Sequence, residues 1–183
     1  AAVERFDSLD PADAGRLLLA ELACTACHAE ASIPSKKGPV LADAGGRLQA
    51  AWLTAGIADP QAVKPGTTMP RTAAKEDVEP LVHYLMSLGK PAAFGSGAGP
   101  KGNEIFHQAG CVACHAPLDG DAKGDKGVVP LGKPGEKWRD PAALAAFLQD
   151  PLKWRPSGRM PKLNLTPQEA MAVAVRLTGQ AAI

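Results

Sequence analysis

Four cysteines, arranged in two identical patterns, are the residues of this sequence best placed for chemistry. The pattern is C-x-x-C-H, and it reads CTACH at residues 24–28 and CVACH at residues 111–115. Two thiols at this spacing can add to the two vinyl groups on one edge of a porphyrin, and the histidine that follows can bind the iron. The residues concerned are Cys24, Cys27 and His28 in the first copy and Cys111, Cys114 and His115 in the second. The sequence therefore predicts two covalently attached haem c groups.

Other chemistries use the same cysteine spacing. Two C-x-x-C pairs can hold one structural zinc ion, each pair can be a redox dithiol, or the four thiols can form two disulfides. None of these alternatives requires a histidine directly after the second cysteine of both copies. The presence of His28 and His115 at these positions therefore favours haem attachment.

An iron bound by one histidine needs a sixth ligand or keeps an open face, and this choice separates electron carriers from enzymes. Met69 and Met160 lie 41 and 45 residues after His28 and His115, each followed by proline in a segment rich in Pro and Gly. Met86 and Met171 instead lie at helical spacing, as core methionines do. Because methionine opposite histidine is the cytochrome c ligand pair, we predict that Met69 and Met160 bind the two irons.

Two further histidines, His83 and His107, are alternative iron ligands. Neither recurs in the other copy, and a single helical histidine is more often a surface or core residue than a ligand.

Two prolines follow the ligand histidines at similar distances. Pro39 and Pro130 lie 11 and 15 residues after His28 and His115. We expect the backbone carbonyls there to accept the imidazole N–H groups and so to tune the basicity of the ligands. Proline also restricts the direction of such a carbonyl.

The residues around both motifs repeat as well. Upstream of the cysteines the offset between the copies is 87 residues, and downstream, from Pro39 and Pro130 onwards, it is 91. The difference of four is one insertion in the polar stretch around residues 119–125, and residues 91–99 read as a linker rich in Gly, Ala and Pro. We therefore predict two tandem domains, at residues 1–90 and 100–183.

The periodicity predicts helices and no strand, so we expect an all-α fold. Asp10 and Pro11 form an N-cap signal for a first helix, and Asp140 with the next proline repeats it. Short helices are expected at 47–57 and 140–149, and closing helices at 75–88 and 167–178. Gly15 and Gly102 in the first helices are expected to let the closing helices approach closely. Trp52 and Trp138 are expected to pack near haem or to donate an indole N–H.

The combination of motifs resembles class I cytochrome c, twice. A helix leads into C-x-x-C-H, followed by the Gly-Pro loop at residues 38–41, the spacing D-P-x4-P-x3-M-P and a closing helix ending at Tyr84 and Leu85. The resemblance implies two domains each wrapped around one covalent haem, with iron ligation by His28 and Met69 and by His115 and Met160. It also implies a solvent-exposed haem edge and a periplasmic or otherwise exported protein, since export precedes haem attachment. The second copy differs in its longer loop after His115 and in a closing helix without an aromatic residue.

Composition and charge exclude other classes of partner. The net charge is +1, there is no basic run, and no apolar stretch approaches the roughly 18 residues of a membrane span. We expect no nucleic acid, no membrane span in this chain, and a signal peptide absent from this chain, because residues 1–5 lack its charged and apolar regions.

The leading hypothesis for function is therefore an electron-transfer diheme cytochrome, free or as a module of a larger redox protein, that works with redox partner proteins and is not itself an enzyme. The alternatives are a diheme peroxidase-like enzyme, the cytochrome subunit of a dehydrogenase, and a haem-based sensor whose iron ligand dissociates.

Overall fold

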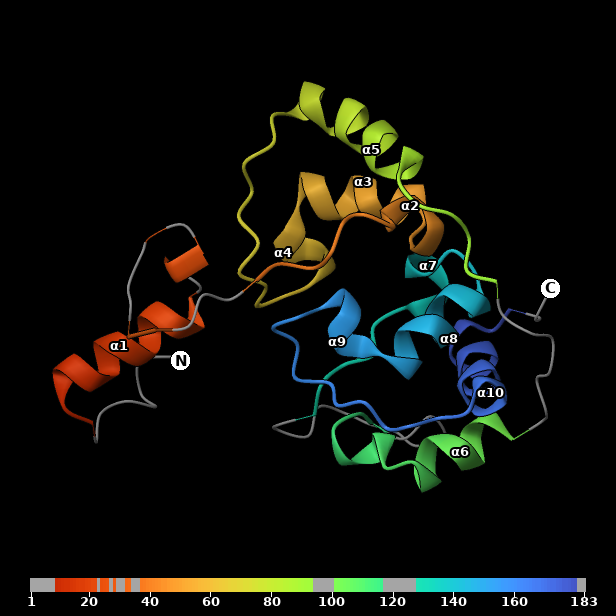
Figure 1. The fold of residues 1–183 in the computed structure, drawn as a ribbon. Coiled ribbons are helices and arrows are strands. Elements are labelled where there is room, and N and C mark those ends of the chain that lie inside the picture. The colour runs from red at the N-terminus through yellow and green to blue at the C-terminus, as the bar shows by residue number, and fades with distance from the viewer. Residues whose placement is uncertain are drawn as a thin grey trace.

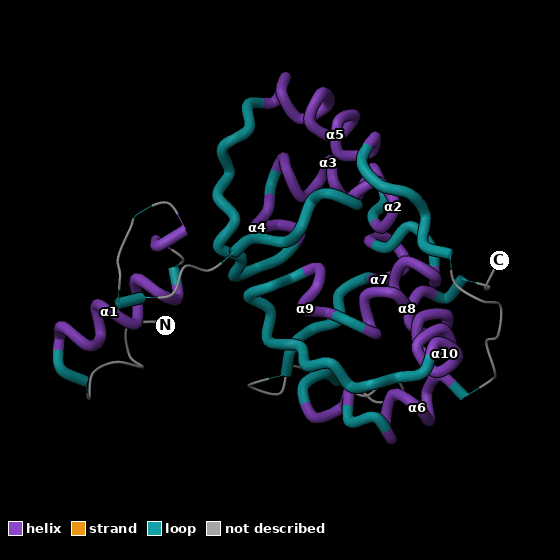
Figure 2. Tube along the Cα trace, in the orientation of Figure 1, coloured by secondary structure: helices purple, strands orange, loops and turns teal. Residues whose placement is uncertain are grey.

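The computed structural model describes residues 9–22, 24–26, 28, 32–33, 37–93, 101–116 and 128–180. These residues form helices joined by loops (Figures 1 and 2). Within the described ranges the β-structure is a single antiparallel bridge between Leu48 and Trp138. The all-α class is confirmed for this part of the chain, and none of its helices is long and apolar enough to cross a membrane. Residues 94–99 of the expected linker lie outside the described residues.

The order of helices in the first half recurs in the second. The first half contains α1 (Pro11–Glu21), η2 (Cys24–Ala26), α2 (Ala44–Arg47), α3 (Ala50–Ala58), α4 (Pro60–Val63), η3 (Lys75–Asp77) and α5 (Val78–Ser87). The second contains α6 (Gly102–Gln108), η4 (Cys111–Ala113), α7 (Pro134–Lys137), α8 (Pro141–Gln149), α9 (Pro151–Trp154) and α10 (Pro167–Thr178). The one-turn 3-10 helices η2 and η4 are 87 residues apart, and α3 and α4 are 91 residues from α8 and α9. The repeat of the sequence is therefore also a repeat of elements.

Local capping explains where several helices begin. The Asp10 carboxylate accepts a hydrogen bond from the Ala12 N–H at 2.8 Å, and the Asp140 carboxylate accepts one from the Ala143 N–H at 2.7 Å. Both N-caps agree with the sequence analysis, since each satisfies a backbone donor that the first helical turn leaves free. The helix expected at 47–57 begins later, at residue 50, because residues 48 and 49 are extended and pair with the second half.

One buried cluster joins the two halves of the chain. Leu48, Leu53 and Val82 from the first half belong to the same cluster as a larger set from the second, which includes Phe106 and Phe147. Across the junction α2 packs against α8, and α3 packs against α7. The halves thus share buried apolar surface, which small units with few aromatic residues need in order to be stable.

The first helices of the two repeats are placed differently. Helix α6 packs against α10, whereas α1 and η2 pack against each other and lie apart from the other helices (Figure 1). Leucine side chains of α1 and of the residue after it are therefore largely open, with 44% of Leu17 and 62% of Leu22 exposed. The expected close approach of the closing helix is confirmed at Gly102, where a Cβ would collide with the Ala172 carbonyl oxygen of α10. At Gly15 nothing lies within 4 Å of such a Cβ, so the expectation is wrong there.

We predict that Gly102→Ala destabilises the protein and that its repeat counterpart Gly15→Ala does not. Overpacking at Gly102 against the Ala172 carbonyl costs about 1–3 kcal/mol. At Gly15 the space is free, so alanine contributes its higher helix propensity, about 1 kcal/mol. Urea unfolding followed by circular dichroism measures both changes in the free energy of unfolding. An equal loss in both variants would contradict the different placement of α1 and α6.

Candidate functional site

The second C-x-x-C-H motif forms a tight turn directly after α6. Gly110 begins η4 with φ 79°, a left-handed conformation that other residues adopt only at a cost. The turn buries Cys111, leaves Cys114 exposed, and brings the His115 N–H to 2.9 Å from the Cys111 carbonyl oxygen. Burial raises the pKa of the Cys111 thiol. Two thiols and one imidazole are thus presented from a single turn.

The imidazole of His115 is held by a backbone carbonyl, but not by the expected one. Its Nδ1 lies 2.9 Å from the Val129 carbonyl oxygen, one residue before Pro130. The expectation for Pro130 is therefore corrected to Val129. The physical reason is that a proline restricts the residue before it to extended backbone, which fixes the direction of the Val129 carbonyl. Because a carbonyl only accepts, Nδ1 carries the hydrogen in this contact and Nε2 keeps a free lone pair.

The four methionines divide as the sequence indicates. Met69 and Met160 lie in loops after α4 and α9, whereas Met86 and Met171 lie in α5 and α10. Met171 is 3% exposed, as expected for a core residue. Met160 is partly buried against the core, whereas Met69 is 49% exposed. The pairing of these two loop methionines with the histidines remains a prediction.

The first motif repeats the backbone turn of the second. Cys24 is half-buried in η2, His28 is exposed, and the His28 N–H lies 2.9 Å from the Cys24 carbonyl oxygen. Cys27 lies outside the described residues. Among the described residues no hydrogen bond joins the His28 ring to Pro39, which is exposed. The role expected for the Pro39 carbonyl thus remains a prediction.

The segment that contains Pro39 contacts the second repeat. The Val40 N–H donates to the Trp154 carbonyl oxygen at 2.8 Å, and the Lys37 N–H donates to the Ser157 hydroxyl at 2.8 Å. This loop of the first repeat therefore runs along α9 and the start of the second Met loop.

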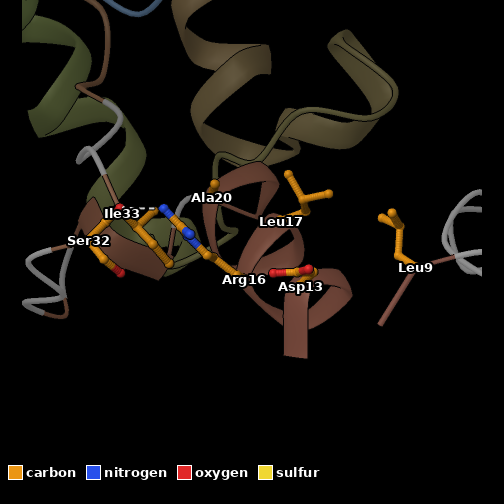
Figure 3. Close-up of a pocket in the computed structure, with 7 residues that line it drawn as sticks. All are labelled: Leu9, Asp13, Arg16, Leu17, Ala20, Ser32 and Ile33. Atoms are coloured by element: carbon orange, nitrogen blue, oxygen red, sulfur yellow. Dashed lines mark hydrogen bonds between the residues drawn. The ribbon is translucent and has the colours of Figure 1, made fainter. Parts of the chain in front are cut away.

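A cavity of about 450 Å³ lies beside α1, next to the first motif (Figure 3). Its lining consists of Leu9, Asp13, Arg16, Leu17, Ala20, Ser32 and Ile33. The Arg16 guanidinium donates to the Ser32 carbonyl oxygen at 3.3 Å and ties the segment after the motif to α1. A cavity of this size with mostly apolar walls is in the range of cofactor sites.

The side chains around both motifs fit a haem group. Leu17 and Leu22 near Cys24, and Val128 and Val129 near His115, are apolar and between 36% and 62% exposed. Exposed apolar groups at such a place indicate that a ligand or partner covers them. A haem would cover them with its flat apolar face while the thiols hold its edge. In the described part of the chain no three His, Cys, Asp or Glu side chains gather as a metal cluster.

The alternative ligands His83 and His107 are surface residues. His83 Nε2 lies 3.7 Å from a carboxylate oxygen of Glu79 on the same helix, and His107 lies edge-on beside Phe106. Both are exposed.

A group of cations lies at the junction of the repeats and was not predicted from the sequence. Arg47 lies over the Trp154 ring, and Arg155 lies over the Phe147 ring. Desolvation by burial, together with repulsion from Arg155, Lys64 and Arg47, lowers the pKa of Lys137 to about 7. Lys137 Nζ lies over the rings of Trp52 and Trp138, at 5.3 and 4.8 Å from their centroids. The expectation that these two tryptophans pack near haem or donate an indole N–H remains a prediction. The sequence feature that could have indicated this group is the equivalence of Lys64 and Arg155, which are both basic and lie at the repeat offset of 91 residues.

Comparison with known proteins gives a family for the first repeat. Residues 12–89 match the model of the cytochrome c family. The chain is also similar to cytochrome c oxidase subunit 2 of Alkalihalophilus pseudofirmus, with 36% identity over 87 residues. That match covers 42% of this chain and 25% of the relative, so the chain spans about a quarter of the relative's length. No solved structure matches the chain.

The family match and the geometry of the motif agree on one chemistry. The family model begins in α1 and ends just after α5, so it includes η2, His28 and the Met69 loop. Covalent haem attachment and electron transfer are the properties of that family. Residues 12–89 are therefore a c-type cytochrome domain, which carries haem and serves electron transport.

Proposed function

We propose that this chain is a diheme electron-transfer protein of two tandem class I cytochrome c domains, at residues 1–90 and 100–183. The observation that carries the proposal is the second motif, outside the segment that the family model matches. There the turn of Cys111 and His115 has the backbone hydrogen bond seen in the first motif, and it lies in the same order of helices. Each domain attaches one haem c through its two cysteines.

The ligands we propose are His28 with Met69 and His115 with Met160. Bound haem supplies a carrier for one electron at a time. The hydrogen bond from His115 Nδ1 to Val129 makes Nε2 a stronger donor to iron and fixes the orientation of the ring. Methionine on the other face favours the reduced state and raises the reduction potential. Met160 is partly buried against the core.

The proposed partners are redox proteins that donate and accept electrons, and the chain itself is a carrier and not an enzyme. The relative named cytochrome c oxidase subunit 2 favours one refinement, a cytochrome module within a larger redox protein. We also propose export to the periplasm or an equivalent compartment, because haem attachment to C-x-x-C-H follows export in the family.

We predict that the purified protein carries two haems that denaturation does not remove. Its mass should exceed the sequence mass of 18.9 kDa by two haem groups. The double variants Cys24→Ser/Cys27→Ser and Cys111→Ser/Cys114→Ser should each retain one, because thioether bonds need the thiols. Intact-mass spectrometry after acid–acetone extraction measures the count. A wild-type mass with one haem or none would overturn the diheme proposal.

We predict that Met69 and Met160 each supply the sixth ligand of one haem iron. The charge-transfer band of methionine-ligated ferric haem should lose about half of its intensity in each of Met69→Ala and Met160→Ala. The matched controls Met86→Leu and Met171→Leu should retain the full band, since both side chains lie in helices and the change conserves volume. Rapid stoichiometric binding of carbon monoxide to the reduced wild-type protein would show an open iron face and favour the peroxidase-like alternative.

A further inference from the structure

The two loops that carry Met69 and Met160 are anchored to the rest of the protein to different degrees. We call residues 64–74 the first Met loop and residues 155–165 the second Met loop, and the two are equivalent at the repeat offset of 91 residues. Met69 is 49% exposed, whereas Met160 packs against the hydrophobic core. Because both methionines precede proline and both loops follow a one-turn helix, the difference arises from the other residues of each loop.

Two leucines attach the second Met loop to the core, and the first Met loop lacks them. Leu163 and Leu165 are partly buried and pack against the core cluster. Their equivalents in the first Met loop are Thr72 and Ala74, and both of these are exposed. The first Met loop contributes Ala73 to the core, which is a single methyl group. Since apolar stabilisation scales with the area removed from water, the second Met loop gains more from its packing than the first.

Hydrogen bonds from distant segments also hold the second Met loop. The Gln149 amide of α8 donates to the Leu165 carbonyl oxygen at 3.3 Å. The Ser157 hydroxyl accepts, at 2.8 Å, from a backbone N–H that lies 120 residues away in the chain. The equivalents of Gln149 and Ser157 in the first repeat are Ala58 and Gly66, which have no side-chain group that could make such bonds. The second Met loop is therefore tied to both repeats.

The hydrogen bonds of the first Met loop are local within the described residues. The Gln61 side chain of α4 accepts from the Gly66 N–H at 3.1 Å and donates to the Thr67 carbonyl oxygen. The Thr67 hydroxyl accepts from the Met69 N–H at 3.2 Å. These bonds shape the start of the loop but join it only to the helix directly before it. A segment with few buried apolar contacts and local hydrogen bonds opens more readily than the rest of a protein.

We propose that the first Met loop opens while the second stays closed, so that the iron site of the first repeat binds a neutral diatomic molecule, represented by carbon monoxide, in place of Met69. In this exchange the bond from the Met69 sulfur to reduced iron breaks and a bond from the ligand carbon forms, and no electron or proton is transferred. An uncharged ligand fits best, because Leu17 and Leu22 near the first motif are apolar and would not stabilise a charge. The inference rests on the proposed function, since it takes Met69 and Met160 as iron ligands.

A loop that must open before a ligand binds produces a characteristic dependence of rate on concentration. At low carbon monoxide concentration the rate of binding rises with concentration, and at high concentration it levels off at the rate of loop opening. An iron with a permanently open face instead binds at a rate that rises in proportion to concentration. We expect the limiting rate to be at least about tenfold higher for the first repeat than for the second, because the two loops differ in their packing and hydrogen bonds.

The test mixes the reduced, haem-loaded protein with carbon monoxide in a stopped-flow instrument and compares two reciprocal double variants. Thr72→Leu/Ala74→Leu gives the first Met loop the two leucines of the second, and Leu163→Thr/Leu165→Ala gives the second the residues of the first. Ala62→Leu is the matched control, because it adds a leucine at an exposed position of α4, outside the loop. Circular dichroism verifies that each variant folds.

We expect the wild type to bind carbon monoxide in two phases of equal amplitude, and the faster phase to level off with concentration. Thr72→Leu/Ala74→Leu should slow the faster phase about three- to tenfold, and Leu163→Thr/Leu165→Ala should speed the slower phase by a similar factor. Ala62→Leu should change neither phase.

Amide hydrogen exchange without carbon monoxide is the second readout. Relative to unfolded peptides, residues 64–74 should exchange at least about tenfold faster than residues 155–165, and Thr72→Leu/Ala74→Leu should slow their exchange.

Equal binding rates at both haems, or phases that do not respond to either double variant, would overturn the proposal. Failure of the proposed function is seen separately, as a wild-type mass that lacks two haems or as binding at both irons that rises in proportion to concentration without limit. In that case hydrogen exchange alone decides. Faster exchange of residues 64–74 that Thr72→Leu/Ala74→Leu slows supports the difference between the loops, and equal exchange of the two loops overturns it.

Discussion

Shortage of apolar bulk is the constraint on which this structure depends. The chain has three Trp, four Phe and one Tyr to stabilise two repeats of about 80 to 90 residues. Units of this size bury a modest share of their surface, so with few bulky side chains they gain stability from a cofactor, a partner or both. The structure meets this need in two ways. Buried residues of both repeats form one cluster, and exposed apolar side chains remain where each C-x-x-C-H motif would hold its haem.

The features that the sequence predicts well are those set by local chemistry. The capping carboxylates of Asp10 and Asp140 and the turns of both motifs depend on neighbouring residues alone. Gly102 was predictable from its place in the repeat, but the same argument failed for Gly15. The collision at Gly102 depends on α10 packing beside α6, whereas among the described residues nothing lies within 4 Å of a Cβ at Gly15 of α1. Equal positions in a repeat therefore do not guarantee equal neighbours.

The features that could not be predicted from the sequence depend on contacts between distant segments. The one-residue difference between Pro130 and Val129 arises because the proline acts on the carbonyl before it. The later start of α3 arises because residues 48 and 49 pair with a segment about 90 residues away. The cations of the junction are far apart in the chain, and only the equivalence of Lys64 and Arg155 hinted that they meet. Pattern and spacing find motifs, but they do not show which loops of two repeats come together.

The bridge between Leu48 and Trp138 has the geometry of a twofold axis within one chain. The Arg139 N–H donates to the Arg47 carbonyl oxygen and the Gln49 N–H donates to that of Lys137, each across the same pair of segments. The bridged residues are 90 apart, whereas at the repeat offset of 91 residues Trp138 is the counterpart of Arg47. The backbone contact is self-complementary because of its antiparallel geometry, while its side chains differ. In a symmetric homodimer every substitution occurs twice. A tandem chain is free of that rule, and it places a leucine on one side of the axis and a tryptophan on the other, so the two repeats diverge at the place where they meet.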